Sequence, residues 1–260
     1  MSRPGRRAGG PPSADLPSLA RGYLAALPLF LAYELALVGG AGTLARSPAE
    51  SFVAFGFLPL GERVLVVRFA LLVVLAGLAL VHEGRAASRP ARPLAGALGA
   101  DVALGALAGF LLAPLLHGLA TWLGSPPLAA APEPARGLSL ALRLAGAAAW
   151  EELLFRVALY GGLYLLVRRT GAFLGLASPL AQGAAELAAL LASAALFALF
   201  HLDALQRALG GAGEPFHAGL FLWRLSAGIL LGGLFRWRGL GVAAWAHAVF
   251  NLGIALGLGR

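Results

Sequence analysis

The chain has 260 residues and a formal net charge of +8; 59% of its residues are hydrophobic and only 12% are charged. Soluble domains carry about 25% charged residues, so this composition excludes an ordinary soluble protein and indicates an integral membrane protein. All cationic side chains are Arg, and most fall between apolar runs, which argues against nucleic acid as a partner. The absence of Cys excludes disulfides and Cys-based catalysis or metal binding.

The first segment, residues 1–19, is rich in Pro, Gly and Arg and predicts a disordered cytoplasmic tail. An apolar run from Tyr23 to Gly40 follows it. This run is longer than the core of a signal peptide, which spans about 7–15 residues. We therefore expect an uncleaved first transmembrane helix.

Further apolar runs approach or exceed the length of about 20 residues that a spanning helix needs. They predict an all-α fold, a polytopic transmembrane helix bundle of about seven spans, at 20–43, 63–82, 94–123, 139–167, 184–208, 216–235 and 239–258. The apolar stretch 171–183 is broken by Pro179 and is interpreted as a re-entrant or interfacial piece.

The distribution of Arg predicts the orientation, because cytoplasmic loops are enriched in positive charge. With the N-terminus inside, the inner segments hold ten Arg residues: Arg3, Arg6, Arg7, Arg85, Arg89, Arg92, Arg168, Arg169, Arg236 and Arg238. The outer segments hold four: Arg46, Arg136, Arg207 and Arg260. We expect a multi-pass protein of the cell inner (cytoplasmic) membrane with a cytoplasmic N-terminus.

Three pairs of Gly with a spacing of four lie in different spans, and small residues at this spacing let membrane helices approach closely. They are Gly105 and Gly109, Gly228 and Gly232, and Gly253 and Gly257. We expect them to serve packing within one chain rather than dimerisation, and the oligomeric state is not predicted.

The first polar motif within the apolar helices is Glu151-Glu152-x-x-x-Arg156. An ionisable residue in such a helix costs roughly 2.5–3.5 kcal/mol on insertion scales, so it marks a functional site by default. Glu152 and Arg156 share a helix face and can pair. Glu151 points about 100° away and can face a cavity as a general base or acid. The alternative is a structural ion pair with a spare Glu.

Two further motifs are Phe197-x-x-x-His201 and His247-x-x-x-Asn251, and Asn251 is the only Asn in the chain. Each alone could be a satisfied core His or a helix-packing Asn. Together with Glu151 they suit peptide hydrolysis: a Glu and a His deprotonate a water, and a second His and an Asn stabilise the oxyanion. Ser193 has no partner that the sequence identifies, so no Ser nucleophile is predicted.

A bound divalent metal such as Zn is the rival mechanism, with Glu151, His201 and His247 as the alternative ligands. The His-Glu-x-x-His motif of zincins is missing from the chain. We therefore favour a site without a metal or other cofactor.

The three motifs, in this order on successive apolar helices, resemble the CPBP or Abi family of intramembrane CAAX prenyl endopeptidases and bacteriocin-processing proteins. The resemblance covers about 140–256 and implies a helical bundle around an intramembrane polar cavity. It implies Glu151 and His201 as the water-activating pair, His247 and Asn251 as the oxyanion-stabilising pair, and Glu152, Arg156 and Phe197 as support. The family is described both as glutamate-type and as metalloprotease. Residues 139–260 are thus expected to be catalytic helices, while 20–138 match no motif.

The expected function is hydrolysis of a peptide bond in a protein or peptide close to the bilayer. The composition favours a bacterial source, in which a bacteriocin leader, a lipidated protein or a carboxyl-terminal sorting signal fits better than a prenylated CAAX substrate. The alternatives are a catalytically idle immunity or scaffold protein of the same fold, and a proton-linked transporter using Glu and His as a relay. A transporter should distribute its ionisable residues along a path, whereas here they collect in three motifs.

Overall fold

The computed structural model describes residues 17–38, 49, 52, 56, 58–86, 93–125, 138–175, 178–208 and 213–256. Its long helices are α1 (Leu19–Val38), α3 (Val64–Ala86), α4 (Leu94–Trp122), α5 (Leu138–Glu152), α6 (Gly162–Phe173), α7 (Pro179–Leu199), α9 (Ala218–Arg238) and α10 (Leu240–Ala255). Shorter pieces are the 3₁₀ segment η2 (Leu58–Arg63), the π-helical segment η3 (Leu153–Gly161) and α8 (Asp203–Ala208). The predicted tail falls almost wholly outside the described residues.

The all-α membrane architecture is confirmed. Within the described residues, five helices are long and apolar enough to cross a bilayer: α1, α3, α4, α7 and α9. α10 is a shorter apolar helix, and α5, η3 and α6 follow one another without a break from Leu138 to Phe173. The chain is therefore a multi-pass membrane protein.

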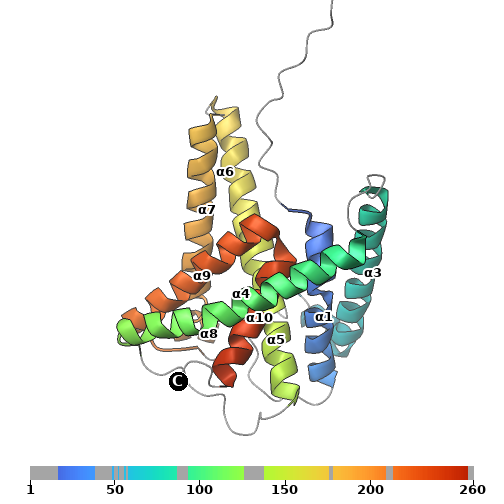
Figure 1. Ribbon diagram of the computed structural model, residues 1–260, viewed down its shortest axis with the longest axis horizontal. Helices are drawn as coiled ribbons and strands as arrows, with labels where there is room; N and C mark the ends of the chain where they lie inside the picture. The colour runs from blue at the N-terminus through green and yellow to red at the C-terminus, as the bar shows by residue number, and fades with distance from the viewer. Residues whose placement is uncertain are drawn as a thin grey trace, which may run out of the picture.

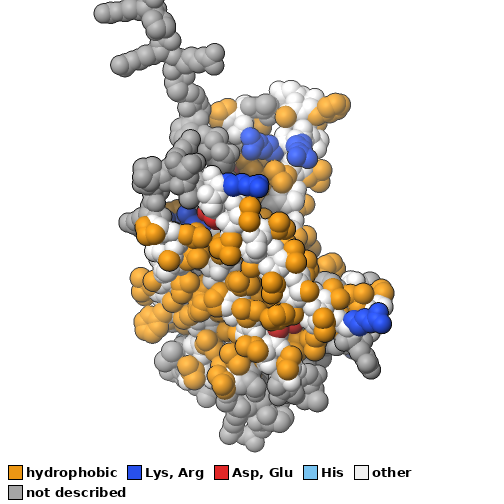
Figure 2. Space-filling view, turned by 90° about the vertical axis from the view of Figure 1, so that its right-hand side faces the viewer, with side chains coloured by type: hydrophobic (Ala, Val, Ile, Leu, Met, Phe, Trp, Pro, Cys, Tyr) orange, Lys and Arg blue, Asp and Glu red, His pale blue; other side chains and the backbone are white. Residues whose placement is uncertain are grey.

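Apolar side chains cover the outside of the bundle as well as its core. Val66, Leu78 and Phe110 are each at least 60% exposed. Figure 2 shows one such face, covered largely by hydrophobic side chains with Arg side chains near its upper end and at one edge. An apolar surface of this extent suits contact with lipid rather than water.

Two expected boundaries are wrong. The described part of 171–183 belongs to the end of α6 and the start of α7, so it is a connection between helices rather than a re-entrant piece, and its interfacial position stays a prediction. Ser178 caps α7 by accepting a hydrogen bond from the Ala181 N–H at 3.2 Å, and Pro179 occupies the first turn, where its missing N–H costs nothing. The span expected at 184–208 ends at Leu199, and a turn separates α7 from α8.

The short helix α10 lies inside the bundle and packs against α1, α4, α5 and α9. In Figure 1, α4 crosses in front of it at a steep angle to α1, α3 and α5. Glycines make this crossing close: a Cβ on Gly109 would lie 2.3 Å from the Ala246 oxygen, and one on Gly105 would lie 2.6 Å from the Trp245 Cβ. The predicted close packing within one chain is thus observed for this pair.

The second Gly pair serves the contact between α7 and α9. A Cβ on Gly228 would lie 3.0 Å from Ala194, and one on Gly232 would lie 2.4 Å from the Leu190 side chain. Gly257 of the third pair falls outside the described residues. These contacts bring α5, α7, α9 and α10, which carry the polar motifs and their neighbours, into one bundle.

Candidate active site

Glu152 and Arg156 form the ion pair that their spacing predicts. Nε of Arg156 donates to Oε2 of Glu152 at 2.9 Å, and both side chains are fully buried. Glu152 ends α5, and Arg156 lies in the π-helical segment that follows. Such segments are rare and frequently occur at functional sites.

His247 on α10 joins this pair from the opposite side. Its Nδ1 lies 2.9 Å from Oε1 of Glu152, and both groups are buried. Because a carboxylate can only accept here, Nδ1 carries the proton, and the ring is fixed with Nε2 pointing away from Glu152. The Glu152 carboxylate therefore bridges Arg156 and His247.

Glu151 lies at the other nitrogen of the same imidazole. Its Oε2 is 3.6 Å from Nε2 of His247, and its side chain is buried. This distance is too long for a direct hydrogen bond, and a polar contact of this length can be mediated by a water. The adjacent residues Glu151 and Glu152 thus flank the His247 ring. Of these two, Glu152 is hydrogen-bonded, whereas Glu151 has no hydrogen-bond partner among the described residues.

His201 lies in the turn after α7, not within a helix as the apolar run suggested. Its Nδ1 is 2.8 Å from the carbonyl oxygen of Phe197. A carbonyl only accepts, so Nδ1 donates and Nε2 keeps a lone pair for a proton or a ligand. The turn is secured by Gln206, whose Nε2 donates to the Phe200 oxygen at 2.5 Å.

The Phe197 ring stands between the two His residues. It makes edge contacts with the ring of His201 at 4.9 Å and with that of His247 at 5.9 Å between centroids. The Arg156 guanidinium lies over it at 5.3 Å. A single buried aromatic side chain therefore sets the separation of His201 from His247 and Arg156.

Asn251 follows His247 by one turn on α10 and is partly buried. Within the described residues, no hydrogen bond or ion pair joins its side chain to Glu151, His201 or His247. The structure thus brings Glu151 and His247 together and places His201 beside them through Phe197. Asn251 is placed near His247 only by the α-helical repeat, because the two residues are four apart on α10.

Ser193 has partners that the sequence did not reveal. Its hydroxyl donates to the Phe155 carbonyl at 2.6 Å and accepts from Nη1 of Arg156 at 3.2 Å. These partners come from the packing of α7 against η3, which the sequence does not specify. Ser193 therefore supports Arg156, and its hydroxyl is engaged in both hydrogen bonds.

Arg224 on α9 was expected to be either ion-paired or snorkelling, and the sequence did not identify Glu214 as its partner. Nε and Nη2 of Arg224 donate to Oε2 and Oε1 of Glu214 at 3.1 and 2.5 Å. The only signal was a lone Arg inside an apolar span, which suits a snorkelling side chain equally well.

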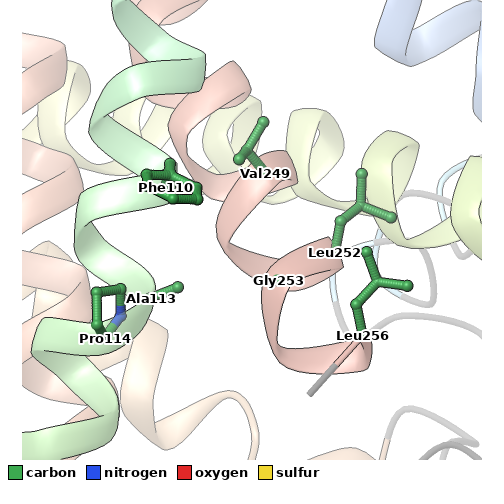
Figure 3. Close-up of a pocket in the computed structure, with 7 residues that line it drawn as sticks. All are labelled: Phe110, Ala113, Pro114, Val249, Leu252, Gly253 and Leu256. Atoms are coloured by element: carbon green, nitrogen blue, oxygen red, sulfur yellow. The ribbon is translucent and has the colours of Figure 1, made fainter. Parts of the chain in front are cut away.

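An apolar groove of about 320 Å³ lies between α4 and α10. Figure 3 shows its lining, which is Phe110, Ala113, Pro114, Val249, Leu252, Gly253 and Leu256. With no polar side chain in its wall, it is not the intramembrane polar cavity expected around the Glu and His residues. That polar cavity stays a prediction.

The Glu and His residues also allow a test of the metal alternative. Nε2 of both His residues is available, and each Nδ1 has the kind of partner that metal-ligating His residues use. Among the described residues, however, no three His, Cys, Asp or Glu side chains gather closely enough to hold a metal ion. The arrangement does not fit a three-ligand centre, and the chemistry proposed below uses side chains and water.

Residues 134–253 match the family model described as type II CAAX prenyl endopeptidase Rce1-like. The matched segment contains all three polar motifs, so the resemblance of this part of the chain to the CPBP family is confirmed. No curated protein and no solved structure matches the chain. Helices α1, α3 and α4 precede the matched segment; α1 and α4 pack against it, and α3 packs against α1.

Proposed function

We propose that the protein is an intramembrane endopeptidase of the glutamate type, in which Glu151 and His201 activate a water molecule. The observation that carries the proposal is a buried cluster of ionisable side chains contributed by α5, η3 and α10, namely Glu151, Glu152, Arg156 and His247. Burying four ionisable groups inside an apolar bundle is costly, and such groups mark functional sites in membranes.

In the proposed first step, the Glu151 carboxylate takes a proton from a water whose oxygen attacks the peptide carbonyl carbon. Nε2 of His201 accepts a hydrogen bond from the same water and orients it. The carbonyl oxygen becomes an oxyanion. Glu151 then delivers the proton to the leaving nitrogen, the C–N bond breaks, and a carboxylic acid and an amine result.

His247 and Asn251 stabilise the oxyanion in this scheme. Because Nδ1 of His247 donates to Glu152, a hydrogen bond from its Nε2 to the oxyanion requires the imidazolium form in this scheme. The side-chain amide of Asn251 supplies a second donor. Losing one oxyanion donor typically costs about 10²–10³ in kcat.

The substrate proposed is a peptide whose cut bond lies close to the membrane. The description of the matched family points to a prenylated carboxyl-terminal CAAX signal. The composition favours a bacteriocin leader, a lipidated protein or a carboxyl-terminal sorting signal.

The test uses purified protein in liposomes, incubated separately with a farnesylated CAAX peptide, a double-Gly leader peptide and a diacylated lipopeptide. Mass spectrometry of the products identifies any cleaved bond, and the Glu151→Gln variant is the control for contaminating proteases. Cleavage that depends on Glu151 supports the proposal. A folded protein that cleaves none of the three classes would favour the idle scaffold alternative.

A further inference from the structure

Arg224 is a cation beside the proposed site that the mechanism above does not use. Its guanidinium holds Glu214 through Nε and Nη2 and packs 5.6 Å from the ring of Trp223. The Arg224 side chain is 13% exposed, whereas that of Glu214 is 38% exposed. A mostly buried cation is therefore fixed in orientation by a carboxylate that remains hydrated.

The Arg224–Glu214 pair is attached directly to the turn that carries His201. The Glu214 N–H donates to the His201 carbonyl at 2.9 Å, and the Glu214 carbonyl accepts from the Asp203 N–H at 2.8 Å. Gly213 permits this approach, because a Cβ there would lie 2.6 Å from the Asp203 nitrogen. The charge of Arg224 also acts on both Glu151 and His201.

One edge of the Arg224 guanidinium is available. Arg has five N–H donors, and Glu214 engages only Nε and Nη2. In the part of the chain that the structure describes, Nη1 has no hydrogen-bond partner. The edge formed by Nη1 and Nη2 can therefore bind a second carboxylate in the forked geometry that Arg and carboxylates prefer.

We propose that this edge of Arg224 binds the terminal α-carboxylate of the substrate peptide, an inference that rests on the proposed function. A CAAX signal is the last four residues of its protein. Its cut bond is consequently within about three residues, or roughly 10 Å, of the free carboxylate. Arg224, one side chain away from the His201 turn, is placed to read that end of the chain and to select carboxyl-terminal over internal sites.

The test measures binding and cleavage with the same peptide pair. A fluorescently labelled, farnesylated CAAX peptide is prepared as the free acid and as the carboxyl-terminal amide. Binding to the detergent-solubilised Glu151→Gln protein, which leaves the peptide uncut, is followed by anisotropy. We expect the acid to bind at least about tenfold more tightly, because a hydrogen bond to a charged group is worth that much.

Introducing Arg224→Gln into the Glu151→Gln protein should abolish this preference, because it should weaken binding of the free-acid peptide and leave binding of the amide unchanged. The matched control is Arg236→Gln on the same helix, where Arg236 donates to Glu186 at 2.8 Å, and it should keep the preference. If Arg224→Gln does not fold, Arg224→Lys retains the charge without the fork and should reduce the preference severalfold. Equal binding of acid and amide, no binding of either, or a preference that survives loss of Arg224 would overturn the inference.

Cleavage by the active protein separates this inference from the proposed function. Cleavage of both peptides at equal rates would support the protease function and contradict the proposed carboxylate-binding role of Arg224. A clear preference for the acid in binding, with no cleavage of either peptide, would support the carboxylate site and count against the protease.

Discussion

Glu152 accepts a hydrogen bond from Nδ1 of His247 at 2.9 Å, although the two residues are 95 positions apart. The same carboxylate holds Arg156, so one buried anion links α5, η3 and α10. Removing one member of a buried charge cluster leaves an uncompensated charge, which costs far more than the net value of the pair. Some of the same side chains therefore contribute to both stability and the proposed catalysis. Variants must be chosen so that a loss of activity can be distinguished from a loss of folding.

Glu151→Gln is the variant that should separate them most clearly. The amide keeps the shape of the carboxylate but cannot accept the proton of the attacking water. We expect cleavage to fall by at least about 10²–10⁴, the usual contribution of a general base, with thermal unfolding in detergent close to that of the original protein. Glu186→Gln, at the partner of Arg236, is the control and should retain activity. Near-normal turnover of Glu151→Gln would refute its role as the base.

Arg156→Ala should instead destabilise the fold. It leaves the fully buried Glu152 with one fewer cation, and breaking a buried pair in this way costs about 3–5 kcal/mol. Arg236→Ala removes the same kind of pair at a site where both side chains are 29% exposed, and it should cost about 1 kcal/mol or less. Denaturation of both variants in the same detergent measures the difference. Equal losses would mean that burial of Glu152 is not what makes Arg156 necessary.

Ser193→Ala distinguishes a Ser nucleophile from the proposed water mechanism. The Ser193 hydroxyl is already committed to the Phe155 carbonyl and to Arg156. We expect the variant to lose about 1 kcal/mol of stability, the net value of an ordinary hydrogen bond, and to keep most of its cleavage activity. Labelling with a fluorophosphonate, which modifies activated Ser residues, should fail on the original protein. Abolished activity in a stably folded Ser193→Ala protein would contradict the proposed site.

Apolar run lengths predicted most of the helices, because a bilayer requires long uninterrupted apolar segments. They could not predict the π-helical segment Leu153–Gly161, since its residues are as apolar as those of an α-helix and the change lies in the backbone repeat. The end of α7 at Leu199 was missed for a related reason. The turn that follows is stabilised by backbone bonds to Glu214 and by Gln206, contacts that are distant in sequence.

Spacing predicted the Glu152–Arg156 pair, because both groups lie on one helix within four residues. The bridge from Glu152 to His247 and the contact of Phe197 with both His rings depend on how α5, α7 and α10 pack. A single sequence contains no distance information of that kind. Arg224 illustrates the same limit, since its partner Glu214 lies in a segment without regular periodicity.

Gly109→Ala tests whether the crossing of α4 over α10 supports the site. The added Cβ would lie 2.3 Å from the Ala246 oxygen, which is backbone and cannot move without shifting the helix that carries His247. We expect a loss of about 1–3 kcal/mol and reduced cleavage. Gly99→Ala on the same helix meets nothing within 4 Å and should be neutral or stabilising by up to about 1 kcal/mol. Unfolding measurements on the two variants test this prediction. Equal stability of Gly109→Ala and Gly99→Ala would contradict a close contact between α4 and α10 at Gly109.

Chelation addresses the rival metal mechanism. We expect cleavage to survive extensive dialysis against a strong chelator, because Glu151 and His201 are proposed to act on water directly. Asn251 is a poor ligand for Zn, and the available donors near His247 are a carboxylate and one further His rather than a compact three-ligand set. The measurement combines a cleavage assay on a susceptible peptide with elemental analysis of the same dialysed sample. Stoichiometric metal, with activity lost on its removal and restored on its return, would make Glu151 and His201 ligands instead. Only the proposal that the protein hydrolyses peptides would then remain.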